Sequence, residues 1–219
     1  MKKKCVCLLS GGIDSSTLVY FLHKEKYEVF PLAVIYGQRH SKEIESAVKI
    51  ANSLGLSLKI ADLTSISSLF AGSALTSGSI AIPEGHYTDE SQSSTVVPNR
   101  NMIFLSLAAA YALTKDCNYV AYAAHANDRS IYPDCRPEFA DAVAKAIKLG
   151  TEKVTMLMPF INITKADIVK LGLRIGVPYS LTTSCDNGEE EACGHCGTCV
   201  ERQEAFELNG VKDSIKYRS

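Results

Sequence analysis

At 219 residues, the chain has the length of one α/β domain with an appendage, and a chain of this size buries roughly 70% of its unfolded surface. Its 23 Lys and Arg and 24 Asp and Glu residues leave a formal net charge of −1, so we expect no stable nucleic-acid partner. No apolar run approaches the roughly 20 residues of a membrane-spanning helix, so we expect neither a membrane partner nor an export signal.

Strand-like and helix-like segments alternate in the first part of the chain. Three apolar, strand-like segments, at 5–9, 29–36 and 56–61, are separated by two helix-like segments, at 17–22 and 42–54. The second helix-like segment has one apolar face, and Gly55 ends it. This order predicts parallel strands joined by right-handed crossovers.

Residues 63–98 interrupt the alternation. They are rich in Ser, Thr and Gly and have no strong periodicity, which is typical of a functional loop, a lid or a disordered segment. A helix predicted at 102–113 follows, and because it is apolar nearly all round we expect it to be deeply buried.

The alternation then resumes. Strands are predicted at 119–123 and 155–158, and a helix at 139–149. Thr164 is expected to cap a further helix at 165–172, with Asp167 completing a capping box. The fold class is therefore α/β, a Rossmann-like five-stranded parallel sheet.

The run at 10–16 follows the first strand and opens the first helix, which is the geometry of an anion site. Gly11 and Gly12 let a ligand approach the backbone closely, and the free N–H groups of the helix start favour phosphate. No Lys-Ser/Thr pair closes the loop, which excludes a Walker A loop, and Ser16 replaces the third glycine of a dinucleotide fingerprint. A tight turn without a ligand remains the alternative.

Ligands of such sheets bind beyond the carboxyl ends of the strands, so the residues after each strand are candidates for the site, among them the run at 125–129. Four arginines in these positions suit a ligand with phosphates and a carboxylate, although each could also face solvent. Lys165 stands at a helix start, against the dipole preference, so either a phosphate partner or chance exposure explains it. The four arginines are Arg39, Arg100, Arg129 and Arg136.

Four of the eight cysteines form a second signal: Cys185, Cys193, Cys196 and Cys199. Their spacing predicts a cage of four thiolates for Zn²⁺, with an iron–sulfur cluster and four unbound thiols as alternatives. A filled cage has no open position for substrate, so the site is expected to be structural. Residues 184–219 would then form a C-terminal zinc-binding helical segment beside a nucleotide-binding domain at 1–183, in a reducing cytoplasm.

The remaining cysteines predict less chemistry. Cys5 and Cys7 share one face of a strand, and Cys117 lies near a helix end, so core packing is expected for all three. Cys135 has an arginine beside it that could lower its pKa, but we favour a binding or structural role over a nucleophile. His195 is expected to face solvent or to support the cysteine cage.

The run Ser-Gly-Gly-Ile-Asp-Ser at 10–15 resembles the signature of the ATP pyrophosphatase superfamily. Together with the runs at 36–40, 97–101 and 132–139 and the cysteine pattern, it resembles the 7-cyano-7-deazaguanine synthase family over nearly the whole chain. The chain departs from that pattern at Asp186, where an aromatic residue is expected, and at 129–131, before Tyr132.

This resemblance implies an adenine nucleotide alpha hydrolase-like fold and an ATP-dependent enzyme. Its substrates would be 7-carboxy-7-deazaguanine and free ammonia, its cofactors Mg²⁺ and Zn²⁺, and its assembly a homodimer. The carboxylate would be activated as an acyl-adenylate, converted to an amide and dehydrated to the nitrile, with release of AMP and pyrophosphate. A tRNA thiolation enzyme with a sulfur-carrying cysteine and a non-catalytic nucleotide-binding module are the alternatives.

The resemblance also assigns residues. The residues implied for ATP binding are Leu8, Leu9, Ser10, Gly11, Gly12, Ile13, Asp14, Ser15, Ser16, Thr17, Leu18, Tyr36 and Gln38. Those implied for substrate binding are Arg39, His40, Arg100, Asn101, Asp134 and Arg136. Those implied for catalysis are Ser10, Asp14, Arg100 and Lys165.

Overall fold

The computed structural model describes residues 2–86 and 92–218. Its centre is a sheet of five parallel strands in the order β3-β2-β1-β4-β5, which confirms the predicted sheet. Strand order reverses at β1, because β2 and β3 lie on one side of it and β4 and β5 on the other. The strands are β1 (Lys4–Leu8), β2 (Glu28–Ile35), β3 (Lys59–Asp62), β4 (Tyr119–Ala121) and β5 (Thr155–Leu157).

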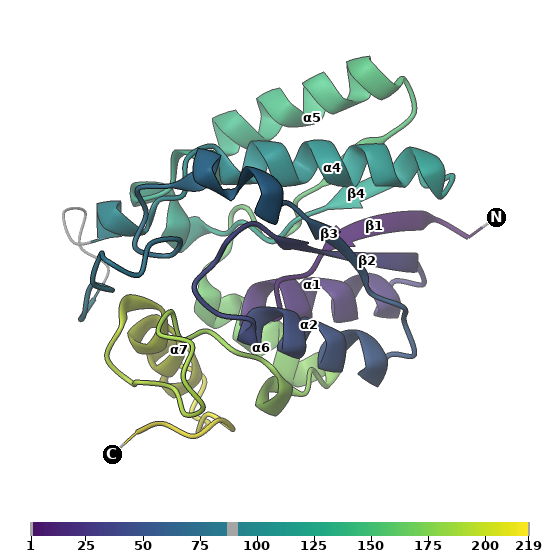
Figure 1. The fold of residues 1–219 in the computed structure, drawn as a ribbon. Coiled ribbons are helices and arrows are strands. Elements are labelled where there is room, and N and C mark those ends of the chain that lie inside the picture. The colour runs from purple at the N-terminus through teal and green to yellow at the C-terminus, as the bar shows by residue number, and fades with distance from the viewer. Residues whose placement is uncertain (1, 87–91, 219) are drawn as a thin grey trace.

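Helices cover both faces of the sheet (Figure 1). One face carries α1 (Ile13–Lys24), α2 (Lys42–Ser53) and α6 (Lys165–Ile175), and the other carries α4 (Arg100–Thr114) and α5 (Pro137–Thr151).

The central strand β1 is apolar from Cys5 to Leu8 because both of its faces are buried there. Cys5 and Cys7 pack into the core cluster of α1, α2 and α6, whereas Val6 packs into the cluster of α4 and α5. Cys117 belongs to that second cluster. The three cysteines therefore pack in the core, as predicted.

The ends and burial of some elements differ from the predictions. The first helix begins at Ile13, and the third strand begins at Lys59 rather than at residue 56. The expected deep burial of the helix at 102–113 is wrong: α4 buries one stripe that includes Leu105 and Ala108, and Leu113 is 45% exposed. The opposite side of α4 faces solvent, because the sheet and α5 contact only one side of this helix.

The segment 63–98 packs on the sheet although the described part contains only short 3₁₀ turns, η1 (Thr64–Phe70) and η2 (Ser93–Thr95). Phe70 is 1% exposed and packs with Val34, Tyr36 and Val97. Residues 87–91 of this predicted loop lie outside the described residues.

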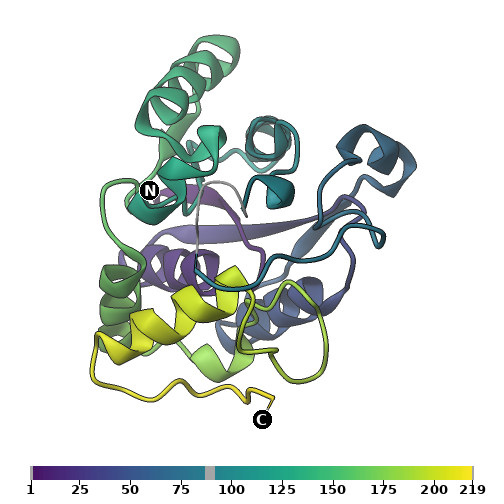
Figure 2. The same cartoon turned by 90° about the vertical axis from the view of Figure 1, so that its left-hand side faces the viewer.

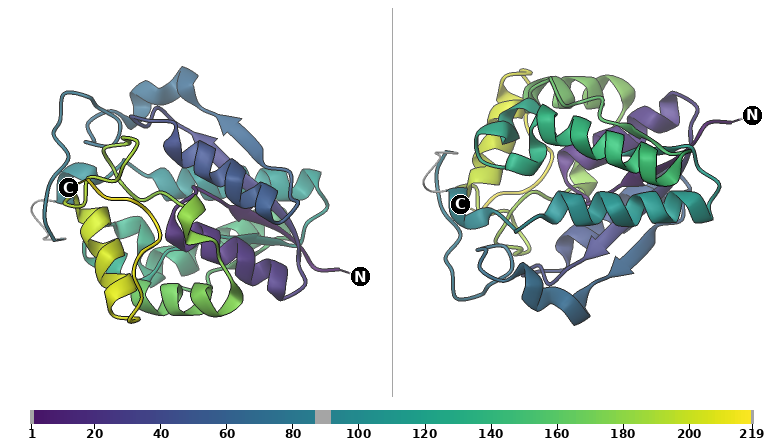
Figure 3. Two further views of the ribbon diagram at one scale, coloured as in Figure 1. Left: turned by 90° about the horizontal axis from the view of Figure 1, so that it is seen from below. Right: turned by 90° about the horizontal axis from the view of Figure 1, so that it is seen from above.

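The last segment crosses the carboxyl edge of the sheet, the side that Figure 2 shows. Its helix α7 (Gly197–Glu207) lies beside α6, which both views in Figure 3 show, and its Ala205 and Phe206 join the core of α1 and α6. Arg202 is fully buried and fixes the end of the chain through Asp213, at 2.6 Å from Nε to Oδ2. No described helix is both long and apolar enough to cross a membrane.

Candidate active site

A cleft of about 220 Å³ opens at the carboxyl edge of the sheet, where the strand order reverses. This is the position at which open α/β sheets bind ligands, and the sequence predicted a site there. The ends of β1, β2 and β4 and the starts of α1, α2 and α4 line it. Its polar lining includes Ser10, Asp14, Ser15, Tyr36, Glu43, Arg100, Asn101, Tyr122 and Asp128.

The loop after β1 leaves the start of α1 open toward this cleft. Gly11 has a φ of +87°, and a Cβ there would lie 2.4 Å from the carbonyl oxygen of Glu43, so only glycine allows this close approach of α2. The N–H of Ser10 donates to Ser15 Oγ at 3.1 Å, which closes the turn. No described side chain caps α1, so its first N–H groups can take an anion.

Six of the predicted ATP-binding residues line the cleft: Leu8, Leu9, Ser10, Asp14, Ser15 and Tyr36. Four others, all on α1, have side chains that are buried in the core and do not line the cleft, so their expected contact with ATP stays a prediction. These are Ile13, Ser16, Thr17 and Leu18.

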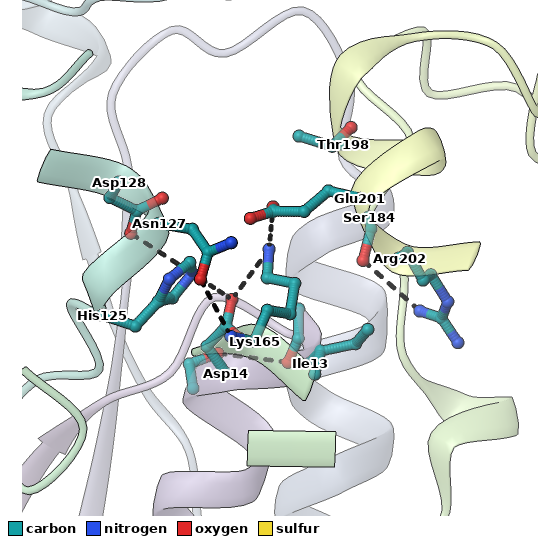
Figure 4. A network of polar contacts seen from close by, with 12 residues as sticks. Ile13, Asp14, His125, Asn127, Asp128, Lys165, Ser184, Thr198, Glu201 and Arg202 are labelled. Atoms are coloured by element: carbon teal, nitrogen blue, oxygen red, sulfur yellow. Dashed lines mark hydrogen bonds and ion pairs between the residues drawn. The ribbon is translucent and has the colours of Figure 1, made fainter. Parts of the chain in front are cut away.

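Charged side chains from α1, α6, α7 and the turn after β4 meet beside the loop (Figure 4). Lys165 Nζ lies 3.4 Å from Asp14 Oδ2 and 2.6 Å from Glu201 Oε2. His125 Nε2 lies 3.6 Å from Asp14 Oδ2 and 3.3 Å from Asp128 Oδ2. The second oxygen of Asp14, Oδ1, is buried and has no hydrogen-bond partner among the described residues.

Contacts within this network determine the charges of Asp14 and Lys165. Burial acts to raise the pKa of the Asp14 carboxyl, but Lys165 and His125 outweigh it and hold the pKa well below its usual value. Burial acts to lower the pKa of His125, but the carboxylates of Asp128 and Asp14 raise it above 6.5. For Lys165 too, nearby carboxylates outweigh burial and raise the pKa. Asp14 is therefore anionic and Lys165 cationic at neutral pH.

Lys165 is 8% exposed, so its chance exposure to solvent is ruled out. Thr164 caps α6 in front of it: the Asp167 N–H donates to Thr164 Oγ1 at 3.2 Å, and the Thr164 N–H donates to Asp167 Oδ2 at 3.1 Å. The predicted capping box is thus present. A local sequence signal therefore places the lysine at the first position of α6.

Arg100 is the predicted arginine that lines the cleft. Its Nη1 donates to Tyr36 Oη at 3.4 Å, and its guanidinium carbon lies 6.0 Å from the centre of the Tyr36 ring. Asn101 donates its N–H to Asp134 Oδ2 at 3.0 Å and its side-chain amide to Cys135 Sγ at 3.4 Å. Asn101 and Asp134 therefore bind each other and hold the start of α4 in place.

The other predicted arginines bond to backbone carbonyl groups. Arg39 donates to the carbonyls of Ala74 and Ile80, and Arg136 Nε donates to the carbonyl of Arg129 at 2.9 Å. Arg129 itself donates to the carbonyl of Ile161 and to the side-chain oxygen of Asn162. Of the four arginines, the lining of the cleft includes Arg100 alone.

Three further predicted residues have structural partners. The Gln38 side chain accepts from the Tyr36 N–H at 2.8 Å and donates to the Val34 carbonyl, which extends the end of β2. The His40 ring packs against Gly188, where a Cβ would lie 2.1 Å from its Cγ. Burial raises the pKa of Cys135 and outweighs the lowering effect of the Arg100 guanidinium, and Cys135 lines the cleft, so a binding or structural role stays the favoured prediction.

The four predicted metal ligands lie together and are all buried. The Sγ atoms of Cys185, Cys193, Cys196 and Cys199 lie within 4.8 Å of one another, and none of them is in a disulfide. Sulfurs bound tetrahedrally at about 2.3 Å would be about 3.8 Å apart, and Cys193 Sγ lies 3.9 Å from Cys199 Sγ. The donor set thus fits one tetrahedral metal ion. His195 lies on the surface, with its side chain 55% exposed and Nδ1 3.3 Å from Glu84 Oε1.

Sequence reasoning named His125 and Asp128 as candidates because their run follows a strand, but nothing in the sequence indicated their place in the polar network beside Asp14. Glu201 belongs to α7 and gave no signal, because its contact with Lys165 depends on how α7 packs.

The comparisons give close relatives. The family description "Queuosine biosynthesis protein QueC" matches residues 4–210. A protein of Caldicellulosiruptor saccharolyticus is 50% identical over 98% of this chain and 95% of its own length. One of Archaeoglobus fulgidus is 52% identical over 97% of this chain and 89% of its own length. Both are named 7-cyano-7-deazaguanine synthase.

Solved structures share the fold at low identity. NMN synthetase from Francisella tularensis has a TM-score of 0.55 and 15% identity, over 97% of this chain and 79% of that one. A 4-thiouridine synthetase, in a complex with RNA and bound ATP, has a TM-score of 0.51 and 18% identity, over 82% of this chain and 42% of that one. The fold is therefore adenine nucleotide alpha hydrolase-like.

Proposed function

The chain belongs to the QueC family of queuosine biosynthesis proteins, and we propose that it converts 7-carboxy-7-deazaguanine, ammonia and ATP into 7-cyano-7-deazaguanine. The observation that carries the proposal is about 50% identity to synthases of that name along almost the full chain. The geometry agrees, because the cleft at the reversal of strand order combines an open helix start with Arg100, and Lys165 lies 3.4 Å from Asp14 of its lining.

The first step activates the carboxylate, which is a poor electrophile. Its oxygen attacks the α-phosphorus of ATP, the bond to pyrophosphate breaks, and an acyl-adenylate forms. The N–H groups at the start of α1, Ser10 and Lys165 stabilise the charge that develops on the phosphorus centre. Arg100 binds the anionic substrate through its forked guanidinium.

Ammonia then attacks the acyl carbon, loses a proton and displaces AMP to give the amide. The amide oxygen then attacks the α-phosphorus of a second ATP, and pyrophosphate leaves. Loss of the amide protons and of AMP leaves the nitrile. Asp14 Oδ1, which has no partner among the described residues, would be a ligand of Mg²⁺, and a bound Mg²⁺ would supply positive charge that offsets the phosphates.

The cysteine group suits Zn²⁺, which four thiolates bind tetrahedrally with no open position. Bound zinc would fold residues 184–219 against the nucleotide-binding residues 1–183. We carry the homodimer and the cytoplasmic location over from the family resemblance, and light scattering of the purified protein tests the dimer.

The thiolation alternative finds little support. A cysteine that carries sulfur to a tRNA base has to present a thiolate, but all eight cysteines are buried, and burial raises the pKa of Cys135, the one that lines the cleft. A non-catalytic nucleotide-binding module would bind ATP without turnover, so the assay below separates it from an enzyme.

Mass spectrometry of one reaction tests the proposal. With 7-carboxy-7-deazaguanine, ATP and ammonium, we expect the amide and then the nitrile, with AMP and pyrophosphate formed only when substrate is present. ADP and phosphate without AMP, or neither amide nor nitrile from protein that binds ATP, would refute it. Sulfur transfer to tRNA by the same sample would instead establish the thiolation function.

A further inference from the structure

Glu201 is a buried carboxylate that reaches the loop from a different part of the chain. Its Oε2 lies 2.6 Å from Lys165 Nζ, and the two side chains are only 9% and 10% exposed. Figure 4 shows it extending from α7 toward Lys165, with Asp14 on the other side of the ammonium group. The lysine is therefore held between two carboxylates, and the one from α7 is the nearer.

The position of α7 depends on the cysteine group. The helix begins at Gly197, between Cys196 and Cys199 of that group. Arg202, the next residue after Glu201, points away from the loop in Figure 4 and bonds to Thr182 Oγ1 at 2.8 Å and to the end of the chain. The cysteines and Arg202 thus fix the rotation of α7 that directs Glu201 at Lys165.

The charge balance explains why a second carboxylate is needed. Lys165 occupies the first position of α6, where the positive end of the helix dipole disfavours a cation. Without Glu201, Asp14 would be the only carboxylate among the described residues within 4 Å of Nζ, and the ammonium would close onto it. The lysine would then leave the position from which it serves the loop.

We propose that Glu201 is a positioning residue for Lys165, so that the cysteine segment sets the geometry of the phosphate-binding loop. This inference rests on the proposed use of ATP. It gives the cysteine segment a second role beside folding, because α7 supplies Glu201, one of the two carboxylates that contact Lys165.

Kinetics of matched variants test the inference. Glu201→Gln keeps the shape and an acceptor but removes the charge, and Glu201→Leu removes both. Glu207→Gln, on the exposed side of the same helix, is the control. We expect kcat to fall about 10-fold in E201Q and about 100-fold in E201L, with less change in KM for ATP and wild-type rates in the control. Metal content equal to that of the wild type shows that the cysteine group is intact.

A double-mutant cycle separates positioning from a general structural effect. In a Lys165→Met background, we expect Glu201→Gln to change kcat and the calorimetric Kd for ATP less than twofold, because it acts through the lysine. Equal losses in both backgrounds, or a wild-type kcat for E201Q, would overturn the inference. If the wild type binds ATP but makes no product, the proposed function fails, and the cycle in Kd alone then decides the inference.

Discussion

At the scale of single residues, Asp14 is the centre of the site because it joins two cations and still has a free oxygen. Oδ2 faces Lys165 and His125, while Oδ1 is buried without a described partner. An unpaired buried acceptor costs free energy unless a ligand satisfies it. The arrangement therefore favours a bound cation or donor beside the phosphate-binding loop.

His125 makes the stability of the protein depend on pH. It is 1% exposed, and the carboxylates beside it raise its pKa in the folded state above 6.5. Its protonated form therefore stabilises the fold fully below pH 6.5, and this contribution is lost as pH rises through the raised pKa. We expect His125→Gln to lower the free energy of unfolding by about 2 kcal/mol at pH 6 and by less at pH 9.

Urea unfolding of both proteins between pH 6 and pH 9 measures this difference. His23→Gln changes an exposed histidine on α1 and is the control, which should show no such trend. A difference for His125→Gln that stays constant over the range would contradict the assigned charge state.

Single residues also show where sequence reasoning stops. Arg39, Arg100 and Arg136 all follow strands, and nothing local separates them. In the structure, Arg100 lines the cleft, whereas Arg39 and Arg136 donate to backbone carbonyl groups. Loop packing decides which way each long side chain points. Glu201, in contrast, follows no strand and was not predicted as a site residue. Its contact with Lys165 arises only from the packing of α7.

At the scale of elements, Gly172 on α6 allows this helix to pack closely against α1 and Tyr179. A Cβ at this position would lie 1.8 Å from Tyr179 Oη and 3.1 Å from Thr17 Oγ1. Those two oxygens share a hydrogen bond of 2.9 Å, so neither moves freely. The close approach brings Lys165, at the start of α6, to the loop that opens α1.

We expect Gly172→Ala to lower the free energy of unfolding by about 3 kcal/mol through overpacking. Gly150→Ala is the matched control, since it lies in α5 with nothing within 4 Å of an added Cβ. Alanine there should raise stability by about 0.5–1 kcal/mol, because glycine weakens a helix. Thermal and urea unfolding compare the two, and similar effects at both sites would refute the packing argument.

The elements that the sequence predicted well are those with local signals. The capping box of α6 and the glycine that follows α2 are properties of a few neighbouring residues, and both are present. Burial of α4 was overestimated because it depends on what the sheet and α5 leave uncovered. The sequence predicted a parallel sheet but not the order of its strands, because strand pairing joins residues far apart in the chain.

At the scale of the whole molecule, the cysteine segment connects parts of the chain that surround the cleft. The Gly85 N–H of the long loop donates to the His195 carbonyl at 2.8 Å, and Glu84 pairs with Cys196 as an isolated β-bridge. His40, in the loop before α2, packs on Gly188. With Glu201 on Lys165, these contacts join the segment to the long loop, to the loop before α2 and to α6.

The last prediction follows from this arrangement. One zinc per chain should copurify with the protein, and its binding can contribute on the order of 10 kcal/mol to local folding. Cys196→Ser, or removal of the metal by a strong chelator, should therefore unfold residues 184–218 and release Gly85, while β1 and β4 stay folded. Hydrogen exchange measures this directly: protection should fall in that segment and at Gly85 but not in the central strands.

Cys117→Ala, which removes a buried thiol outside the group, should keep the metal and this protection. Unchanged exchange in metal-free protein would contradict a supporting role for the cysteine group, and iron with matching sulfide would contradict zinc.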